Sequence, residues 1–332
     1  MKTKNSLRFP ALLVLGTSLT MAPTLAAQAT ADNWVPGPGW TLAWADEFNG
    51  NTVNPDNWTY DLGGGGWGNH ELETYTTDSA TVQGGELRIT ARKNADGSYS
   101  SARLKTQGRQ SWTYGKFAAR MRLPQGQSLW PAFWMLGTNI TTVGWPKCGE
   151  IDIMEMIGGG ENRDDSVYGT LHWDANGHAS AGSGRIELVD PEIFHDDYHV
   201  FEVEWSPTTM VWKIDGAETA RVSIDPIVWP EKEEFQKPFF IVLNLAVGGD
   251  WPGPPDASTV FPQALAVDWV RVYTSAGTAS APVITTQPAP APAPASSGGG
   301  GGGGGAPSLY FLSVLLVLDL LRGRRSPARL VG

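Results

Sequence analysis

Apolar and polar side chains alternate along several short stretches of this chain, and this period of two constrains the fold more than any other feature. Phe117, Ala119, Met121 and Leu123 alternate with one alanine and two arginines, and residues 87–92 repeat the pattern. Side chains two residues apart share one face of a strand, so these stretches are predicted to be half-buried strands. No long stretch has a convincing helical period.

Further strands are predicted by turn signals and by continuous apolar runs. Residues 211–214 lead into Asp215-Gly216 and out again through residues 219–222, which is typical of a β-hairpin. Residues 238–247 form an apolar run of strand length, as a buried central strand would, and residues 266–273 supply a last strand. We therefore expect an all-β fold, a two-sheet antiparallel β-sandwich.

Three carboxylates lie within six residues in the stretch 149–156, which reads Gly-Glu-Ile-Asp-Ile-Met-Glu-Met. On a strand, Glu150 and Asp152 point to one face while the isoleucines point into a core. Strict alternation sends Glu155 to the other face, and a β-bulge at residues 153–154 would bring it back beside the other two acids. We interpret the stretch as the floor of an active site; the alternative is an amphipathic strand with a solvated acidic face.

All fifteen tryptophans lie between Trp34 and Trp269. Indole rings stack on the apolar faces of pyranose rings, so this content suggests a sugar-binding cleft, with core packing as the alternative for any single ring. Five tryptophans lie in strand-like patterns and are expected in the core: Trp44, Trp58, Trp205, Trp212 and Trp269. Five lie beside glycine or proline or near the acidic stretch and are expected in the cleft: Trp67, Trp130, Trp134, Trp145 and Trp251.

Charge and cysteine content narrow the class of protein. The formal net charge is −10, and because both ends of the chain are basic, the segment between them is more acidic still. An acidic body argues against nucleic acid as a partner and fits a neutral substrate. The single cysteine, Cys148, excludes an internal disulfide network, and no His/Cys cluster has zinc spacing.

Both ends look like processing segments. Residues 1–29 combine a basic start, an apolar run and small residues before a cleavage site, as a signal peptide does, so we expect a folded domain over residues 30–275. A Pro/Ala-rich and then Gly-rich linker follows at residues 276–305. Residues 306–332 carry an apolar stretch and an arginine cluster, and with the glycine run they resemble the GlyGly-type sorting tags of Gram-negative bacteria. That resemblance implies cleavage by a rhomboid-like protease; the alternative is a low-complexity tail.

The domain between these ends resembles glycoside hydrolase family 16, in its bacterial laminarinase-like branch, over about residues 40–273. The resembling stretches occur in the family's order and include Asp46-Glu47-Phe48-Asn49, Trp67-Gly68-Asn69, Trp130-Pro131-Ala132-Phe133-Trp134, Glu150-Ile151-Asp152-Ile153-Met154-Glu155, Leu171-His172-Trp173 and Asn244-Leu245-Ala246-Val247-Gly248-Gly249. The two residues between Asp152 and Glu155 are similar to the laminarinase branch, since the lichenase branch has one fewer. The resemblance implies a β-jelly roll with a concave cleft.

The resemblance also implies catalytic roles. Glu150 is the expected nucleophile, Glu155 the general acid/base, and Asp152 assists between them. A retaining glycosidase needs two carboxyl groups about 5–5.5 Å apart, one ionised and one protonated. No cofactor is required for this chemistry.

Other positions are expected to bind substrate or metal. Asn69 and Arg109 match family positions that bind glucosyl hydroxyls, with a turn asparagine and a surface arginine as alternatives, and His172 is expected near the departing sugar or as a structural histidine. The family often holds a structural Ca²⁺, and the resemblance implies Glu47, the Gly85 carbonyl and Asp268 as its ligands. Oxygen ligands suit this ion, and the alternative for Asp268 is a cap on the last strand. His70 and Glu73 depart from the asparagine and glutamine more often found in laminarinases.

These observations lead to one principal hypothesis on function. We expect a monomeric, secreted or surface-attached endo-β-1,3-glucanase that acts with retention on laminarin-like glucan, with signal peptidase and the rhomboid-like protease as processing partners. The alternatives are a mixed-linkage β-1,3-1,4-glucanase or another polysaccharide hydrolase of the family, and a noncatalytic glucan-binding protein. The presence of all three acids favours an enzyme.

Overall fold

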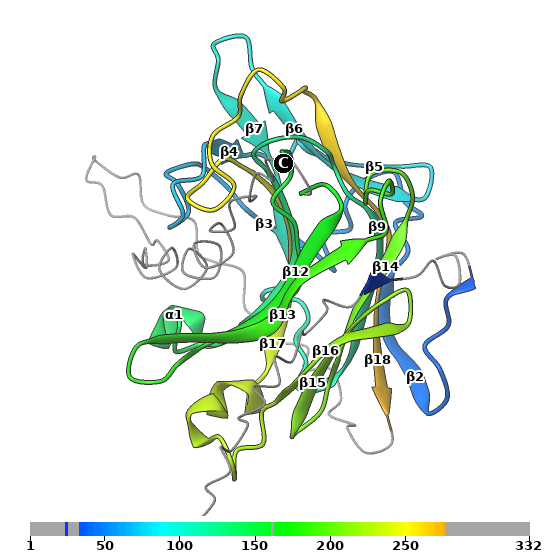
Figure 1. Cartoon of the computed structure of the whole chain (residues 1–332), viewed down its shortest axis with the longest axis vertical. Coiled ribbons are helices and arrows are strands. Elements are labelled where there is room, and N and C mark those ends of the chain that lie inside the picture. Colours follow the sequence, from blue (N-terminus) through cyan, green and yellow to red (C-terminus); the bar gives the residue numbers. More distant parts are fainter. Residues whose placement is uncertain (1–23, 26–32, 161–162, 276–332) are drawn as a thin grey trace, which may run out of the picture.

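Two β-sheets lie face to face in the protein, as the computed structural model in Figure 1 shows for residues 24–25, 33–160 and 163–275. Most strand pairs are antiparallel, which confirms the predicted sandwich. The processing segments expected at 1–29 and 276–332 lie almost wholly outside the described residues and stay predictions. In the described part of the chain, no helix is long and apolar enough to cross a membrane.

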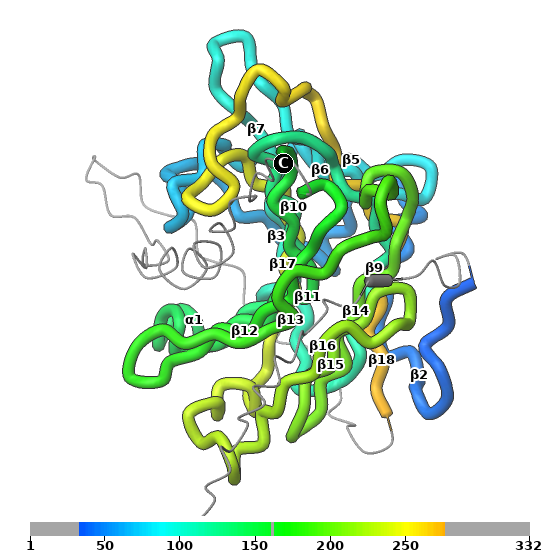
Figure 2. The backbone as a smooth tube through the Cα atoms, viewed as in Figure 1, coloured from blue at the N-terminus to red at the C-terminus, as the bar shows by residue number. Residues whose placement is uncertain are grey.

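The first sheet contains the acidic stretch. Its eight strands, in spatial order, are β1 (Thr24–Leu25), β13 (His178–Leu188), β12 (Ser166–Asp174), β11 (Glu150–Glu155), β10 (Leu129–Gly137), β17 (Phe239–Val247), β8 (Arg103–Lys105) and β3 (Thr59–Asp61). Because β11 lies between β10 and β12, its acids are held from both sides by backbone ladders (Figure 2).

The second sheet has ten strands. Eight follow the order β16 (Ala217–Ser223), β15 (Thr209–Ile214), β14 (His199–Trp205), β9 (Gly115–Arg122), β18 (Gln263–Ser275), β6 (Glu86–Lys93), β7 (Tyr99–Ser101) and β4 (Glu73–Tyr75), while β2 (Trp40–Asp46) pairs with β18 and β5 (Ala80–Gln83) with β6. The last strand of the described chain, β18, thus lies in the middle of its sheet. Two short helices, α1 (Ile140–Val143) and the 3-10 helix η2 (Pro230–Gln236), lie in the connections.

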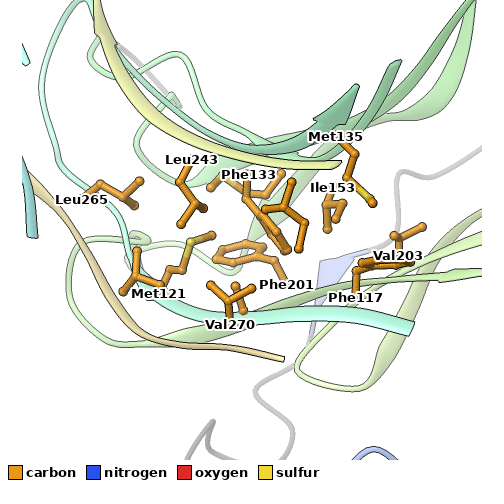
Figure 3. Close-up of a cluster of buried hydrophobic side chains, with 14 of the residues drawn as sticks. Phe117, Met121, Phe133, Met135, Ile153, Phe201, Val203, Leu243, Leu265 and Val270 are labelled. Carbon is orange, nitrogen blue, oxygen red and sulfur yellow. The ribbon is translucent and has the colours of Figure 1, made fainter. Parts of the chain in front are cut away.

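The core fills the space between the sheets. Phe133 and Leu243 from the first sheet meet Phe117, Phe201 and Val270 from the second, and all five are almost fully buried (Figure 3). Each such side chain contributes about 1.5–3 kcal/mol by leaving water. The alternation predicted for β6 and the hairpin of β15 and β16 are confirmed.

The outer face of β9 differs from the expected half-buried strand. Ala118 points away from the main core and is nevertheless fully buried, because it packs with Trp269 and with Trp34 from the segment before β2. Trp269 is therefore buried as predicted, but in a separate cluster on the outside of the second sheet. The sequence pattern of β9 alone does not reveal this cover, which comes from residues more than 80 positions away.

Candidate active site

A cleft of about 620 Å³ opens on the outer face of the first sheet. Its floor comes from β10, β11, β12 and β17, and its walls from β3, β8 and three connecting loops. The five tryptophans predicted for the cleft all line it: Trp67, Trp130, Trp134, Trp145 and Trp251. Glu150, Asp152 and Glu155 line it together, so the side chains that the sequence pattern singled out converge on one surface.

The predicted bulge is present in β11. Asp152 pairs with Trp134 of β10 and Met154 pairs with Phe133, so Ile153 is the extra residue without a partner in this ladder. The ladder to β12 shifts between Asp152 and Glu155 in the same place. Ile153 remains in the main core while Glu155 reaches the cleft, which strict alternation does not allow.

The bulge is supported from behind by the second sheet. Trp212 of β15 donates its indole N–H to the backbone oxygen of Asp152 at 2.8 Å. Gly169 on β12 makes room for this ring, because a Cβ at that position would lie 2.4 Å from the indole. A buried carbonyl needs such a partner, so the hydrogen bond stabilises the turned strand.

His172 faces the acids from the neighbouring strand β12. Its Nε2 lies 3.1 Å from Oδ2 of Asp152 and 3.8 Å from Oε1 of Glu150, and the side chain is 3% exposed. Its place as cross-strand partner of Glu150 sets this geometry. His172 is thus in the cleft, in contact with the acids, rather than in the core.

Burial governs the protonation of the three acids. Burial and the charge of Asp152 raise the pKa of Glu150 to about 8, and the same two causes raise the pKa of Glu155 to about 8. Burial raises the pKa of Asp152 as well. His172 opposes these shifts at both glutamates, and Trp130 opposes the shift at Glu155 by donating its indole N–H to Oε1 at 3.0 Å. Such a cluster holds protons at neutral pH, so it can supply both a proton donor and a carboxylate.

A buried hydrogen-bond network connects the floor of the cleft to its wall. Trp134 donates to Asn244, Asn244 donates to the hydroxyl of Tyr75, and that hydroxyl donates to Glu71, at 2.7, 3.2 and 3.0 Å. The side-chain amide of Asn69 donates to the other oxygen of Glu71 at 3.0 Å. Asn69 therefore lines the cleft. The hydrogen bonds that orient it could not be predicted from the sequence beyond the resembling stretches.

Glu73 lies behind this network and is 1% exposed. Its Oε2 accepts the backbone N–H of Val247 at 2.7 Å, while its Oε1 has no hydrogen-bond partner among the described residues. Burial, followed by the charge of Glu71, raises the pKa of Glu73 well above its ordinary value. The departure from glutamine noted in the sequence therefore places a buried acid with a raised pKa behind the cleft.

Arg109 does not reach the cleft. It is exposed in the turn after β8, where its backbone N–H donates to the Thr106 oxygen at 2.9 Å. Arg103 on β8 lines the cleft instead, with its guanidinium 5.2 Å from the ring of Trp67 and 4.7 Å from that of Trp134. The sequence resemblance missed Arg103, because its place in the cleft depends on the pairing of β8 with β17 and β3.

The expected calcium ligands have other partners. Both carboxylate oxygens of Glu47 accept bonds from Arg271 at 2.7 Å, and Asp268 Oδ2 accepts one from Arg120 at 3.0 Å. An arginine beside each carboxylate opposes a divalent cation, so this arrangement does not fit Ca²⁺ unless both ion pairs open. The Gly85 carbonyl and the ion itself stay a prediction.

Glu150, Asp152 and His172 are the one group of metal-type donors within 4.8 Å of one another among the described residues. Hydrolysis by paired carboxyl groups explains this arrangement without assigning the three residues as ligands. We therefore treat them as acid–base groups.

Comparison with known proteins agrees with this geometry. The family model "Glycosyl hydrolases family 16" matches residues 68–271. A β-glucanase of Rhodothermus marinus is 39% identical, with 82% of this chain and 96% of that protein covered. The clotting factor G alpha subunit of Tachypleus tridentatus is 41% identical, but the chain spans only 35% of its length. The crystal structure of the laminarinase catalytic domain of Thermotoga maritima superposes with a TM-score of 0.65 at 41% identity, covering 71% of this chain and 98% of that one.

Proposed function

This chain belongs to glycosyl hydrolase family 16, and we propose that it cleaves β-1,3-glucan within the polymer and with retention at the anomeric carbon. One observation carries the proposal: the bulge in β11 turns Glu150, Asp152 and Glu155 together into a tryptophan-lined cleft. The chain is a glycoside hydrolase, and the relatives with long coverage are a β-glucanase and a laminarinase. The neutral glucan also fits the acidic charge of the protein.

The reaction proceeds in two displacements. The carboxylate of Glu150 attacks the anomeric carbon while Glu155 gives its proton to the departing glycosidic oxygen, so the C–O bond breaks and a glycosyl ester forms. Glu155, now ionised, takes a proton from a water molecule that attacks the same carbon from the face of the departed sugar. The ester bond breaks, and both glutamates return to their starting states.

Asp152 and His172 set the charges that this sequence of events needs. The negative charge of Asp152 favours the protonated form of both glutamates, and at Glu155 this suits a proton donor. His172 favours the ionised form of both glutamates, and at Glu150 this suits a nucleophile. We propose that His172 thereby counters the burial of Glu150 and keeps the nucleophile available.

The wall of the cleft fits a chain of neutral sugars. The Arg103 guanidinium lies between Trp67 and Trp134 and is held by Asp61 at 3.1 Å. Trp130 and Trp251 also line the cleft and meet edge to face at 5.6 Å. Indoles fixed in this way present pre-oriented rings to pyranose faces, so little entropy is lost on binding.

Matched variants test the proposal. Glu150→Gln and Glu155→Gln should each abolish release of reducing sugar from laminarin while circular dichroism and the melting temperature stay close to wild type. Glu218→Gln, on the exposed strand β16, is the control and should retain full activity. Full activity in either active-site variant would refute the mechanism, and a wild type active on lichenan but not laminarin would reassign the substrate. Proton NMR of early products should show the β-anomer first.

We further propose that residues 1–29 direct export, that residues 306–332 are removed, and that the mature protein is a monomer. The support is the sequence pattern of the two ends, which lie almost wholly outside the described residues. Intact mass of the exported protein checks both cleavages, and light scattering checks its oligomeric state. Retention of residues 309–332 in the exported protein would refute the processing.

A further inference from the structure

Two histidines form a stacked, hydrogen-bonded pair at the edge of the cleft. Nδ1 of His172 lies 2.8 Å from Nε2 of His178, and the two rings are 5.0 Å apart and inclined by only 26°. His178 opens β13, directly after the hairpin turn from β12. It is half-buried, and the indole of Trp145 covers it at 4.7 Å.

Both ring nitrogens of His172 are therefore engaged. Nε2 faces the carboxyl groups of Asp152 and Glu150, and Nδ1 faces His178. An imidazole nitrogen either donates or accepts, so one proton lies between the two rings. Two protons on that line would repel each other, and at most one of the two histidines can carry a positive charge.

The surroundings decide which histidine is charged. Burial, followed by the charge of His172, lowers the pKa of His178 to about 4. His178 is therefore neutral at the pH where a glucanase works, and any positive charge of the pair resides on His172, beside the carboxylates. The other charged groups that act on these acids are Glu155 on the same strand, Glu71 and Arg103.

We propose that His178 is a positioning residue for the reaction: its hydrogen bond to Nδ1 fixes the ring orientation and the protonated Nε2 of His172, and so tunes Glu150 and Glu155. His178 does not line the cleft, and the contact through which it acts on the acids is its hydrogen bond to His172. The inference rests on the proposed function, because its kinetic consequence concerns the same two glutamates. It assigns a role to a side chain outside the acidic strand.

Two substitutions separate the hydrogen bond from the ring contact. His178→Phe retains a ring against Trp145 but removes the hydrogen bond, whereas His178→Gln retains a polar group near the position of Nε2 but removes the ring. We expect His178→Phe to lower kcat on laminarin about tenfold, as loss of an orienting partner does elsewhere, with KM nearly unchanged. His178→Gln should keep most of the activity.

The pH profile gives a readout that a structural defect would not move. His172 lowers the pKa of both glutamates. Loosening His172 should therefore raise both values and shift both limbs of the kcat/KM profile to higher pH by about one unit in His178→Phe. His195→Phe, in which the replaced ring contacts the backbone oxygen of Leu123 away from the cleft, is the control and should keep the wild-type profile.

The possible outcomes are distinguishable. The inference would be overturned, while the proposed function stands, if His178→Phe showed wild-type kinetics. It would also be overturned if both His178 variants lost kcat equally and kept the wild-type pH profile of kcat/KM. If wild-type protein releases no sugar from laminarin, the proposed function fails. The pair is then still tested by ¹⁵N NMR of the imidazoles, which should show His178 neutral and hydrogen-bonded down to about pH 5 and the bond absent in His178→Phe. Independent titration of the two rings would contradict the pairing.

Discussion

Trp130 of β10 donates its indole N–H to Oε1 of Glu155 at 3.0 Å, so the proposed proton donor is held by a neighbouring strand. This bond favours the ionised form and lowers the pKa of Glu155. Trp130→Phe should therefore raise that pKa and shift the alkaline limb of the kcat/KM profile to higher pH, with lower kcat because Glu155 loses its orientation. Trp229→Phe, in a surface loop, is the control. An unchanged alkaline limb would contradict this role.

The raised pKa of Glu73, the buried acid behind the cleft, predicts that the stability of the protein depends on pH. The folded state raises the pKa of Glu73, so between the unfolded and folded values the unfolded chain gives up a proton that the folded protein keeps. Stability is then complete below the unfolded pKa and falls as the pH rises. Glu73→Gln should melt close to wild type at pH 4 and about 2 °C or more higher at pH 8. If Glu73→Gln and wild type melt at the same temperature at pH 8 as well as at pH 4, ionisation of Glu73 does not destabilise the folded protein.

The space beneath the bulge predicts a steric effect. A Cβ at Gly169 would lie 2.4 Å from the Trp212 ring, whose N–H holds the Asp152 carbonyl. Gly169→Ala should displace this ring, lower the free energy of unfolding by about 1–3 kcal/mol and reduce kcat. Gly50→Ala is the matched control, since its Cβ would meet only ordinary contacts at 3.5 Å. Chemical denaturation of both variants gives the comparison, and equal stabilities would refute the packing argument.

The arginine between two indoles predicts an effect on substrate binding. Arg103→Lys keeps a positive charge near Asp61 but loses the planar group between Trp67 and Trp134. Without this contact the two indoles are less well oriented for the sugar rings, and a loss of about 1 kcal/mol in binding raises KM for laminarin about fivefold, with kcat nearly unchanged. Arg109→Lys, exposed outside the cleft, should leave both constants unchanged. A larger effect from Arg109 would show that the turn after β8 carries the binding arginine.

The expected metal site gives a fifth test. Glu47 and Asp268 are already paired with Arg271 and Arg120. A divalent ion would have to displace an arginine from each carboxylate before it could bind there. We expect EDTA to leave the melting temperature unchanged, and added Ca²⁺ to have no effect. Stabilisation by Ca²⁺ that disappears in Glu47→Gln would establish the site implied by the family resemblance.

Local order was predictable from the sequence, and long-range register was not. The period of two decides which acids of one strand share a face, so Glu150, Asp152, Glu155 and the bulge could be predicted from eight residues. The bond between Tyr75 and Asn244 joins positions 169 residues apart, and it depends on how distant strands align. His178 likewise acquires its contact through the register of one hairpin. A sequence pattern specifies which side chains share a face, but packing decides which of them meet.

Because β18 lies in the middle of the second sheet, that sheet cannot be completed until the end of the domain has been synthesised. This strand joins β9 on one side to β6 on the other, yet it is the last strand of the domain to be synthesised. While residues 263–275 remain inside the ribosome, the second sheet is divided into two unconnected parts, and the sheet that carries the acids has no complete surface to pack against. The second sheet can close only once residues 263–275 are available, so the cleft can form only after the whole domain has been made.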